Sequence, residues 1–142
     1  MTLDSAAPRN KKVAGIILAA GCGSRMGKAK QLLPFGRTTL LGHVMDTVQS
    51  AGLDCVVLVL GFNAGQVRHA LNLPRREQAR PYRTSIQVID NPDWHKGQSF
   101  SVAAGLKALP ADMDGALFLL GDQPLVTARF FNPRYLIPIV IF

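Results

Sequence analysis

The chain has 142 residues, which is enough for one hydrophobic core and too few for two cores of ordinary size. Apolar residues make up 48% of the sequence and charged residues 18%, which excludes a disordered tail and a collagen-like repeat. The 16 basic residues outnumber the 9 acidic ones, and no acidic residue occurs from Ser5 to Met45. This basic excess indicates a site for an anionic ligand or a basic arm for nucleic acid or membrane, and composition alone does not choose between them.

A basic N-terminal arm, residues 1–12, precedes the apolar run Val13–Ala20. This order imitates an export signal, and Leu18–Cys22 resembles a lipoprotein cleavage box. The run of eight residues is near the lower limit for a signal peptide, however, and the glycine-rich segment after it is more typical of a phosphate loop. The cysteines, Cys22 and Cys55, lack zinc-site spacing and form no disulfide framework. No run approaches the ~20 apolar residues of a membrane-spanning helix. We therefore expect a cytoplasmic protein without a membrane partner.

Apolar runs bounded by turn residues alternate with segments of helical periodicity along the chain. This alternation predicts right-handed βαβ crossovers, and hence an α/β fold of Rossmann-like three-layer α/β/α architecture with a mostly parallel sheet. Ligands bind beyond the carboxyl ends of the strands in such sheets, so the loops at that edge become the candidates for the site. The expected strands are 13–19, 55–60, 85–89 and 115–120. The first expected helix is capped by Thr38 or Thr39 and runs through Ser50, and the second is capped by Asn63 and ended by Pro74. The third expected helix is Ser99–Leu109.

The segment Gly21–Gly27 directly follows the first expected strand. Its third glycine comes one residue too late for a dinucleotide fingerprint, and its spacing and the Ala29 after Lys28 do not fit a Walker loop. What remains is a glycine loop that carries Arg25, Lys28 and Lys30, where backbone N–H groups approach an anion closely. A tight turn with solvated charges is the alternative interpretation.

The segment Gly121–Pro124 follows the last expected strand and places Asp122 at the same sheet edge as the glycine loop. Because Mg²⁺ takes one or two protein carboxylates together with substrate phosphates, this pairing suggests a Mg²⁺ bridge. The alternative is an aspartate at the first position of a turn, and the local sequence supports both equally.

The segment Gly97–Ser101 resembles a nucleophile elbow except that its last residue must be glycine and is serine. A helix N-terminus explains it better, with Ser99 or Ser101 either capping the helix or contacting a ligand phosphate. The histidines have no second ligand at metal spacing, and we assign no chemistry to His43, His69 and His95.

Three blocks of the sequence together resemble a known family. Leu18–Gly27 and Lys30–Pro34 resemble the opening of nucleotidyltransferases with the GT-A-like Rossmann fold. Asn91–Val102 and Gly121–Leu125 are similar to the branch that attaches a nucleotide to molybdopterin, the molybdenum cofactor cytidylyltransferases. The blocks occur in the family's order between residues 13 and 126.

The resemblance implies transfer of CMP from CTP to the terminal phosphate of molybdenum-loaded molybdopterin, with release of pyrophosphate. It implies catalytic roles for Arg25 and Lys30 on the triphosphate and for Asp122 as the ligand of Mg²⁺, without a covalent nucleophile. CTP or another nucleoside triphosphate, a molybdopterin-type acceptor and a recipient molybdenum enzyme are the expected partners, and nucleic acid is not. The expected nucleotide-binding residues are Leu18, Ala19, Ala20, Gly21, Gly23, Ser24, Arg25, Lys30, Ser99 and Ser101.

The sequence departs from the family's pattern after the Gly121–Leu125 block. Family members continue with further strands, whereas residues 127–142 form an atypical tail, so we expect residues 1–142 to be a single partial domain truncated at its C-terminus. Two alternatives stay open: a non-catalytic nucleotide- or cofactor-binding carrier for molybdenum enzymes, and a nucleotidyltransferase with another phosphorylated acceptor. Ala20, where relatives that use GTP tend to carry glycine, favours the smaller cytosine ring.

Overall fold

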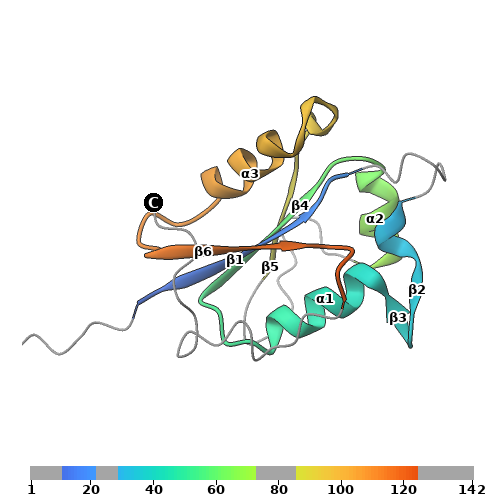
Figure 1. Cartoon of the computed structure of the whole chain (residues 1–142), viewed down its shortest axis with the longest axis horizontal. Helices are drawn as coiled ribbons and strands as arrows, with labels where there is room; N and C mark the ends of the chain where they lie inside the picture. Colours follow the sequence, from blue (N-terminus) through green and yellow to red (C-terminus); the bar gives the residue numbers. More distant parts are fainter. Residues whose placement is uncertain (1–10, 22–28, 73–85, 125–142) are drawn as a thin grey trace, which may run out of the picture.

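A computed structural model describes residues 11–21, 29–72 and 86–124 of the chain (Figure 1). The predicted N-terminal arm up to residue 10, the glycine-loop residues Gly23, Ser24 and Arg25, and the tail 127–142 lie outside the described residues. The elements are β1 (Val13–Ala19), the 3-10 helix η1 (Lys30–Leu32), β2 (Pro34–Phe35), β3 (Thr38–Thr39), α1 (Leu40–Gln49), β4 (Cys55–Leu60), α2 (Ala64–Ala70), β5 (Ile86–Asp90), the 3-10 helix η2 (Trp94–Lys96), α3 (Gln98–Lys107) and β6 (Gly115–Leu120).

The main sheet of the described residues has the strand order β5-β4-β1-β6, and each neighbouring pair is parallel. β1 lies inside the sheet, with Ile16 opposite Val57 of β4 on one side and Phe118 of β6 on the other. Strands covered on both faces need apolar side chains throughout, which is why β1 and β4 read as continuous apolar runs. The predicted parallel α/β sheet is confirmed.

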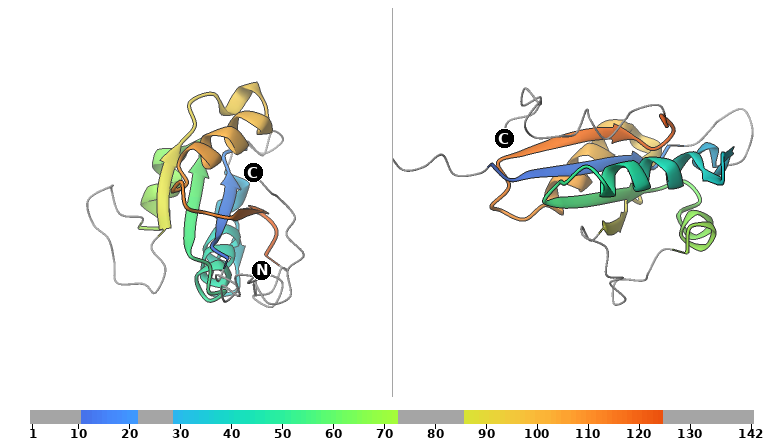
Figure 2. Two further views of the ribbon diagram at one scale, coloured as in Figure 1. Left: turned by 90° about the vertical axis from the view of Figure 1, so that its left-hand side faces the viewer. Right: turned by 90° about the horizontal axis from the view of Figure 1, so that it is seen from below.

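Helices cover both faces of this sheet and complete the three layers (Figure 2). Alternate strand residues point to opposite faces. Ile17 of β1 therefore joins the core beneath α1 and α2, whereas Ile16 joins the core beneath α3. At Gly105, α3 lies so close to the sheet that a Cβ there would be 2.6 Å from Cγ2 of Ile16.

Helix α1 begins as the sequence predicts. The Oγ1 atom of Thr39 accepts a hydrogen bond of 3.0 Å from the backbone N–H of Gly42, as a capping residue does. The preceding residues form a small antiparallel β2-β3 hairpin that the sequence analysis did not predict. Strands of two residues are too short to show the alternation of apolar and polar residues that identifies a strand in a sequence.

Asn63 is the N-cap of α2, as predicted, but it has the left-handed conformation, with φ of 52°, and its side chain makes no capping hydrogen bond. The predicted start of α3 is wrong. The N-cap of α3 is Gly97 rather than Ser99 or Ser101, which lie inside the helix. Helix η2 also occupies the segment expected to be a loop between β5 and α3. Within the described part of the chain, no helix is long and apolar enough to cross a membrane.

Candidate functional site

The carboxyl ends of the parallel strands are tied together by the loops that follow them. Backbone N–H groups of these loops donate to carbonyl oxygens at the ends of neighbouring strands: Gly121 to Leu18 at 3.0 Å, Phe62 to Ala20 at 3.0 Å, and Asn91 to Leu60 at 2.7 Å. The predicted ligand contacts Leu18, Ala19 and Ala20 are at most 9% exposed. The structure places them beneath this edge, and their contact with a nucleotide stays a prediction.

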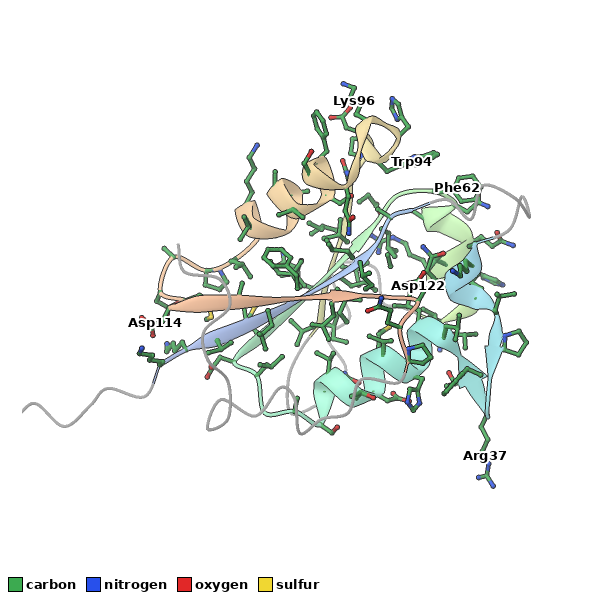
Figure 3. The ribbon with its side chains drawn as sticks, viewed as in Figure 1. Arg37, Phe62, Trp94, Lys96, Asp114 and Asp122 are labelled. Atoms are coloured by element: carbon green, nitrogen blue, oxygen red, sulfur yellow. The ribbon has the colours of Figure 1, made fainter. Side chains whose placement is uncertain are left out.

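Asp122 stands in the turn directly after β6, at this edge (Figure 3). The turn approaches β1 closely because Gly121 is buried, and a Cβ on it would lie 3.0 Å from Cβ of Ala19. Gln123 closes the turn with a backbone hydrogen bond of 3.2 Å to Leu120. The position of the carboxylate is thus set by the backbone of both strands.

Lys30 meets Asp122 at this edge. Its Nζ atom lies 3.4 Å from Oδ2 of Asp122, and the two side chains are 57% and 34% exposed. The residues are far apart in the sequence, and the structure brings together the two that were expected to hold triphosphate and metal. Because both groups remain accessible, each is free to exchange its partner for a ligand of opposite charge.

The donor set at this edge suits a divalent cation that arrives with a nucleotide. No group of three or more His, Cys, Asp or Glu side chains gathers as a metal site within the described ranges. Mg²⁺ commonly takes one or two protein carboxylates and fills its remaining positions with substrate phosphates and water. The single carboxylate of Asp122, beside a cation for the phosphates, fits this pattern.

Gln31 follows Lys30 and supports the start of the glycine segment from within the protein. Its side chain is only 5% exposed. Its Nε2 atom donates to the carbonyl oxygens of Ala19 at 2.9 Å and of Gly21 at 3.0 Å. The sequence does not single out this residue, because its bonds are to backbone atoms.

Trp94 and Phe62 form an aromatic pair above the ends of β1 and β4, with ring centroids 5.3 Å apart (Figure 3). Trp94 packs so closely on the backbone of β4 that a Cβ on Gly61 would lie 2.5 Å from its Cβ and 2.8 Å from Cβ of Ala20. Ala20 is 4% exposed, so its methyl group is buried beside these residues. The preference for cytosine that was inferred from Ala20 stays a prediction.

The serines expected at the nucleotide have different environments. Ser99 is exposed near the start of α3. Ser101 is 3% exposed, and its Oγ accepts a hydrogen bond of 2.8 Å from Nδ2 of Asn91. Since Oδ1 of Asn91 also accepts from the backbone N–H of Asp93, this pair holds the β5–α3 loop on the helix. A ligand contact at Ser101 would have to share this buried bond.

Cys55 lies at the start of β4, the opposite edge of the sheet from Asp122. Burial raises the pKa of the Cys55 thiol, and the nearby carboxylates of Asp54 and Asp112 raise this pKa further. A thiol with a raised pKa is a poor nucleophile at neutral pH. Cys22 lies outside the described residues, and the absence of a covalent intermediate stays a prediction.

A family model described as the MobA-like NTP transferase domain matches residues 15–133. The chain belongs to the MobA-like NTP transferase family. The match confirms the family that the sequence blocks indicated.

Among curated proteins, the nicotine blue oxidoreductase of Paenarthrobacter nicotinovorans is 38% identical over 79% of this chain and 50% of its own length. A nucleotidyl transferase from Methanothermobacter thermautotroptrophicus has a TM-score of 0.70 at 28% identity, covering 84% of this chain and 55% of that one. Rv0371c from Mycobacterium tuberculosis, solved in complex with manganese, has a TM-score of 0.62 at 30% identity, covering 85% and 56%. The chain spans about half the length of these relatives.

Proposed function

We propose that this protein is a cytoplasmic nucleotidyltransferase that transfers CMP from CTP to the terminal phosphate of a molybdopterin-type acceptor. The observation that carries the proposal is the meeting of Lys30 and Asp122 at 3.4 Å, beside the start of the glycine segment. A cation and a carboxylate at one accessible edge are what a triphosphate with a divalent metal requires. The family match supports the same reaction class.

In the proposed mechanism, Lys30 releases Asp122 and binds oxygens of the triphosphate as a compact point charge. Asp122 is the residue that would hold Mg²⁺, which neutralises phosphate charge when bound. An oxygen of the acceptor phosphate attacks the α-phosphorus of CTP and forms a new P–O bond. The bond from the α-phosphorus to the bridging oxygen breaks, and pyrophosphate leaves with the electron pair. The protein contributes positioning and charge stabilisation.

The glycine segment completes the proposed triphosphate site. We assign the backbone at Gly21, Gly23 and Ser24 to the nucleotide phosphates and the guanidinium of Arg25 to the triphosphate, as the family resemblance implies. Gly21 is exposed at the end of β1, so ligand can reach the start of the segment. Gly23, Ser24 and Arg25 lie outside the described residues.

A redox function is the second candidate, because one relative is named an oxidoreductase and matches most of this chain. A nicotinamide dinucleotide also carries phosphates that a glycine segment and Lys30 can bind. The exposed carboxylate of Asp122 favours the transferase, since it has a role with a metal-bound triphosphate and repels a dinucleotide's phosphates. A carrier that binds nucleotide without turnover is the third candidate.

Pyrophosphate release separates these functions. The protein is incubated with Mg²⁺ and molybdopterin, and with CTP, GTP or ATP in parallel, while a coupled assay follows pyrophosphate. The transferase predicts acceptor-dependent pyrophosphate with CTP as the preferred nucleotide. Binding of CTP without pyrophosphate indicates the carrier. In a parallel incubation with a reduced nicotinamide dinucleotide and an electron-accepting dye, oxidation of the nicotinamide with reduction of the dye, and no pyrophosphate with CTP, indicates the redox enzyme. Either result overturns the proposal.

A further inference from the structure

The side chain of Gln31 uses its donor atom in hydrogen bonds to described residues but not its acceptor atom. Both of its bonds to described residues use the donor Nε2, whereas Oε1 is buried and has no partner in the described part of the chain. A buried acceptor without a partner costs free energy, and such groups are uncommon in native proteins. An apolar side chain of the same size would avoid this cost. The residue is therefore poorly explained as a contribution to stability alone.

The two donor bonds fall on either side of Ala20, at the point where β1 ends and the glycine segment begins. The bond to Ala19 is buried, and the bond to Gly21 is partly buried. The carbonyl of Ala20 between them accepts the N–H of Phe62 from the β4 loop. One amide group thus fixes the direction in which the backbone leaves the strand.

The same residue fixes Lys30. Gln31 is joined to Lys30 by a peptide bond, and both lie in helix η1, which the Leu33 N–H closes by donating to the carbonyl of Lys30 at 3.1 Å. Ala29, on the other side of Lys30, is 3% exposed. The exposed side chain of Lys30 therefore lies between two buried residues. The hydrogen bonds of Gln31 to Ala19 and Gly21 fix the distance of Lys30 from the start of the glycine segment.

We propose that Gln31 is a positioning residue that fixes Lys30 relative to Gly21, the first residue of the glycine segment, before a nucleoside triphosphate binds. The inference rests on the proposed function. Gln31 does not touch the reacting atoms and acts through the backbone of Gly21 and through Lys30. Correct spacing before binding lowers the ordering cost of binding and of reaction, and a displacement of about 1 Å can cost on the order of 100-fold in rate.

The first test is Gln31→Met, a substitution of similar length that lacks the donor and also lacks the buried unpaired oxygen. We expect the melting temperature to fall by less than about 10 °C, because the carbonyl oxygens of Ala19 and Gly21 lose their donor while the unpaired buried oxygen of Gln31 is removed. Calorimetric titration with CTP and Mg²⁺ should show an affinity at least about tenfold weaker. Thr47→Val, which removes a hydroxyl-to-backbone bond of 3.0 Å on α1, is the matched control and should leave CTP affinity unchanged.

The second test is Gln31→Glu, which keeps the shape of the side chain. At neutral pH its carboxylate faces the two carbonyl oxygens that Nε2 faced, so CTP affinity should fall further than with methionine. Lowering the pH to about 5 protonates a growing fraction of buried carboxyl groups and restores one donor. CTP affinity, measured relative to the parent protein at each pH, should then recover in part.

The outcomes separate the inference from the function on which it rests. If the parent protein binds no nucleoside triphosphate, the proposed function fails. If the parent binds CTP and Gln31→Met binds it equally well, the positioning role is refuted while the function survives. If Gln31→Met lowers the melting temperature by more than about 10 °C, the pH dependence of Gln31→Glu tests the positioning role instead. A CTP affinity of Gln31→Glu that does not change with pH relative to the parent also refutes the positioning role.

Discussion

The substitution Asp122→Asn separates a metal ligand from a turn residue. Asparagine serves a turn nearly as well as aspartate, and it is nearly isosteric. What it removes is the negative charge that faces Lys30 at 3.4 Å. The change therefore tests whether the charge of Asp122 matters for the reaction, with little disturbance of the loop after β6.

The cost in stability follows from the ion pair. At 3.4 Å, two unit charges in bulk water attract by about 1.2 kcal/mol. Since the side chains are 57% and 34% exposed, solvent screening and side-chain entropy reduce the net contribution to about 0–1 kcal/mol. We therefore expect Asp122→Asn to lower the melting temperature by at most about 4 °C.

The cost in activity is larger. In the proposed site, loss of the carboxylate removes the protein ligand of the metal. We expect the loss of this electrostatic element to lower turnover by about 100-fold or more, which is about 2.7 kcal/mol in the barrier. The assay is pyrophosphate release with CTP, Mg²⁺ and acceptor. Binding of CTP without metal should be unchanged or slightly tighter, because the carboxylate repels phosphate. Turnover near the parent level in a protein with an unchanged melting temperature would refute the reasoning.

The other expectations concern the cation, the helix packing and the thiol. Lys30→Met should weaken CTP binding. It should tighten the binding of Mn²⁺ in the absence of nucleotide, because Asp122 loses the positive charge with which it is paired. A fall of both affinities in calorimetry would contradict the role of the Lys30–Asp122 ion pair. Gly105→Ala should lower the free energy of unfolding by about 1–3 kcal/mol, because the new Cβ would lie 2.6 Å from a methyl group of the fully buried Ile16. A denaturation midpoint at or above that of the parent protein would show that α3 has room to shift. Because the pKa of the Cys55 thiol is raised in the folded protein, the unfolded chain ionises first and stability should fall as pH rises above that unfolded pKa; a Cys55→Ala variant with the same alkaline loss would contradict this assignment.

The sheet was predictable because its signals are local. β1, β4 and β6 have the residue ranges that the apolar runs predict, and a run such as Cys55–Leu60 between turn residues has few other interpretations. The α1 cap at Thr39 was predictable for the same reason. The start of α3 was not predictable, because Gly97 and the two serines after it all suit a helix start. In the structure Gly97 is the N-cap, and the side chain of Ser101 bonds to Asn91.

The site was predictable only in part. The sequence placed Lys30 and Asp122 at one edge, since the carboxyl ends of parallel strands share an edge, but their direct contact depends on how the turn at Gly121 packs on β1. The role of Gln31 depends on bonds to backbone atoms, which leave no pattern in the sequence. The packing of Trp94 on Gly61 is likewise a matter of three-dimensional fit.

In the proposed site, a metal-bound nucleoside triphosphate sits between Lys30 and Asp122. Mn²⁺ broadens the NMR signals of nearby nuclei, so amide spectra recorded with CTP and substoichiometric Mn²⁺ locate the metal directly. The account predicts broadening centred on Gly121–Gln123 and Lys30, with Asp112 and Asp114 at the opposite end of β6 as the internal control. Broadening centred on those two carboxylates, or broadening near Asp122 that persists in Asp122→Asn, would contradict it.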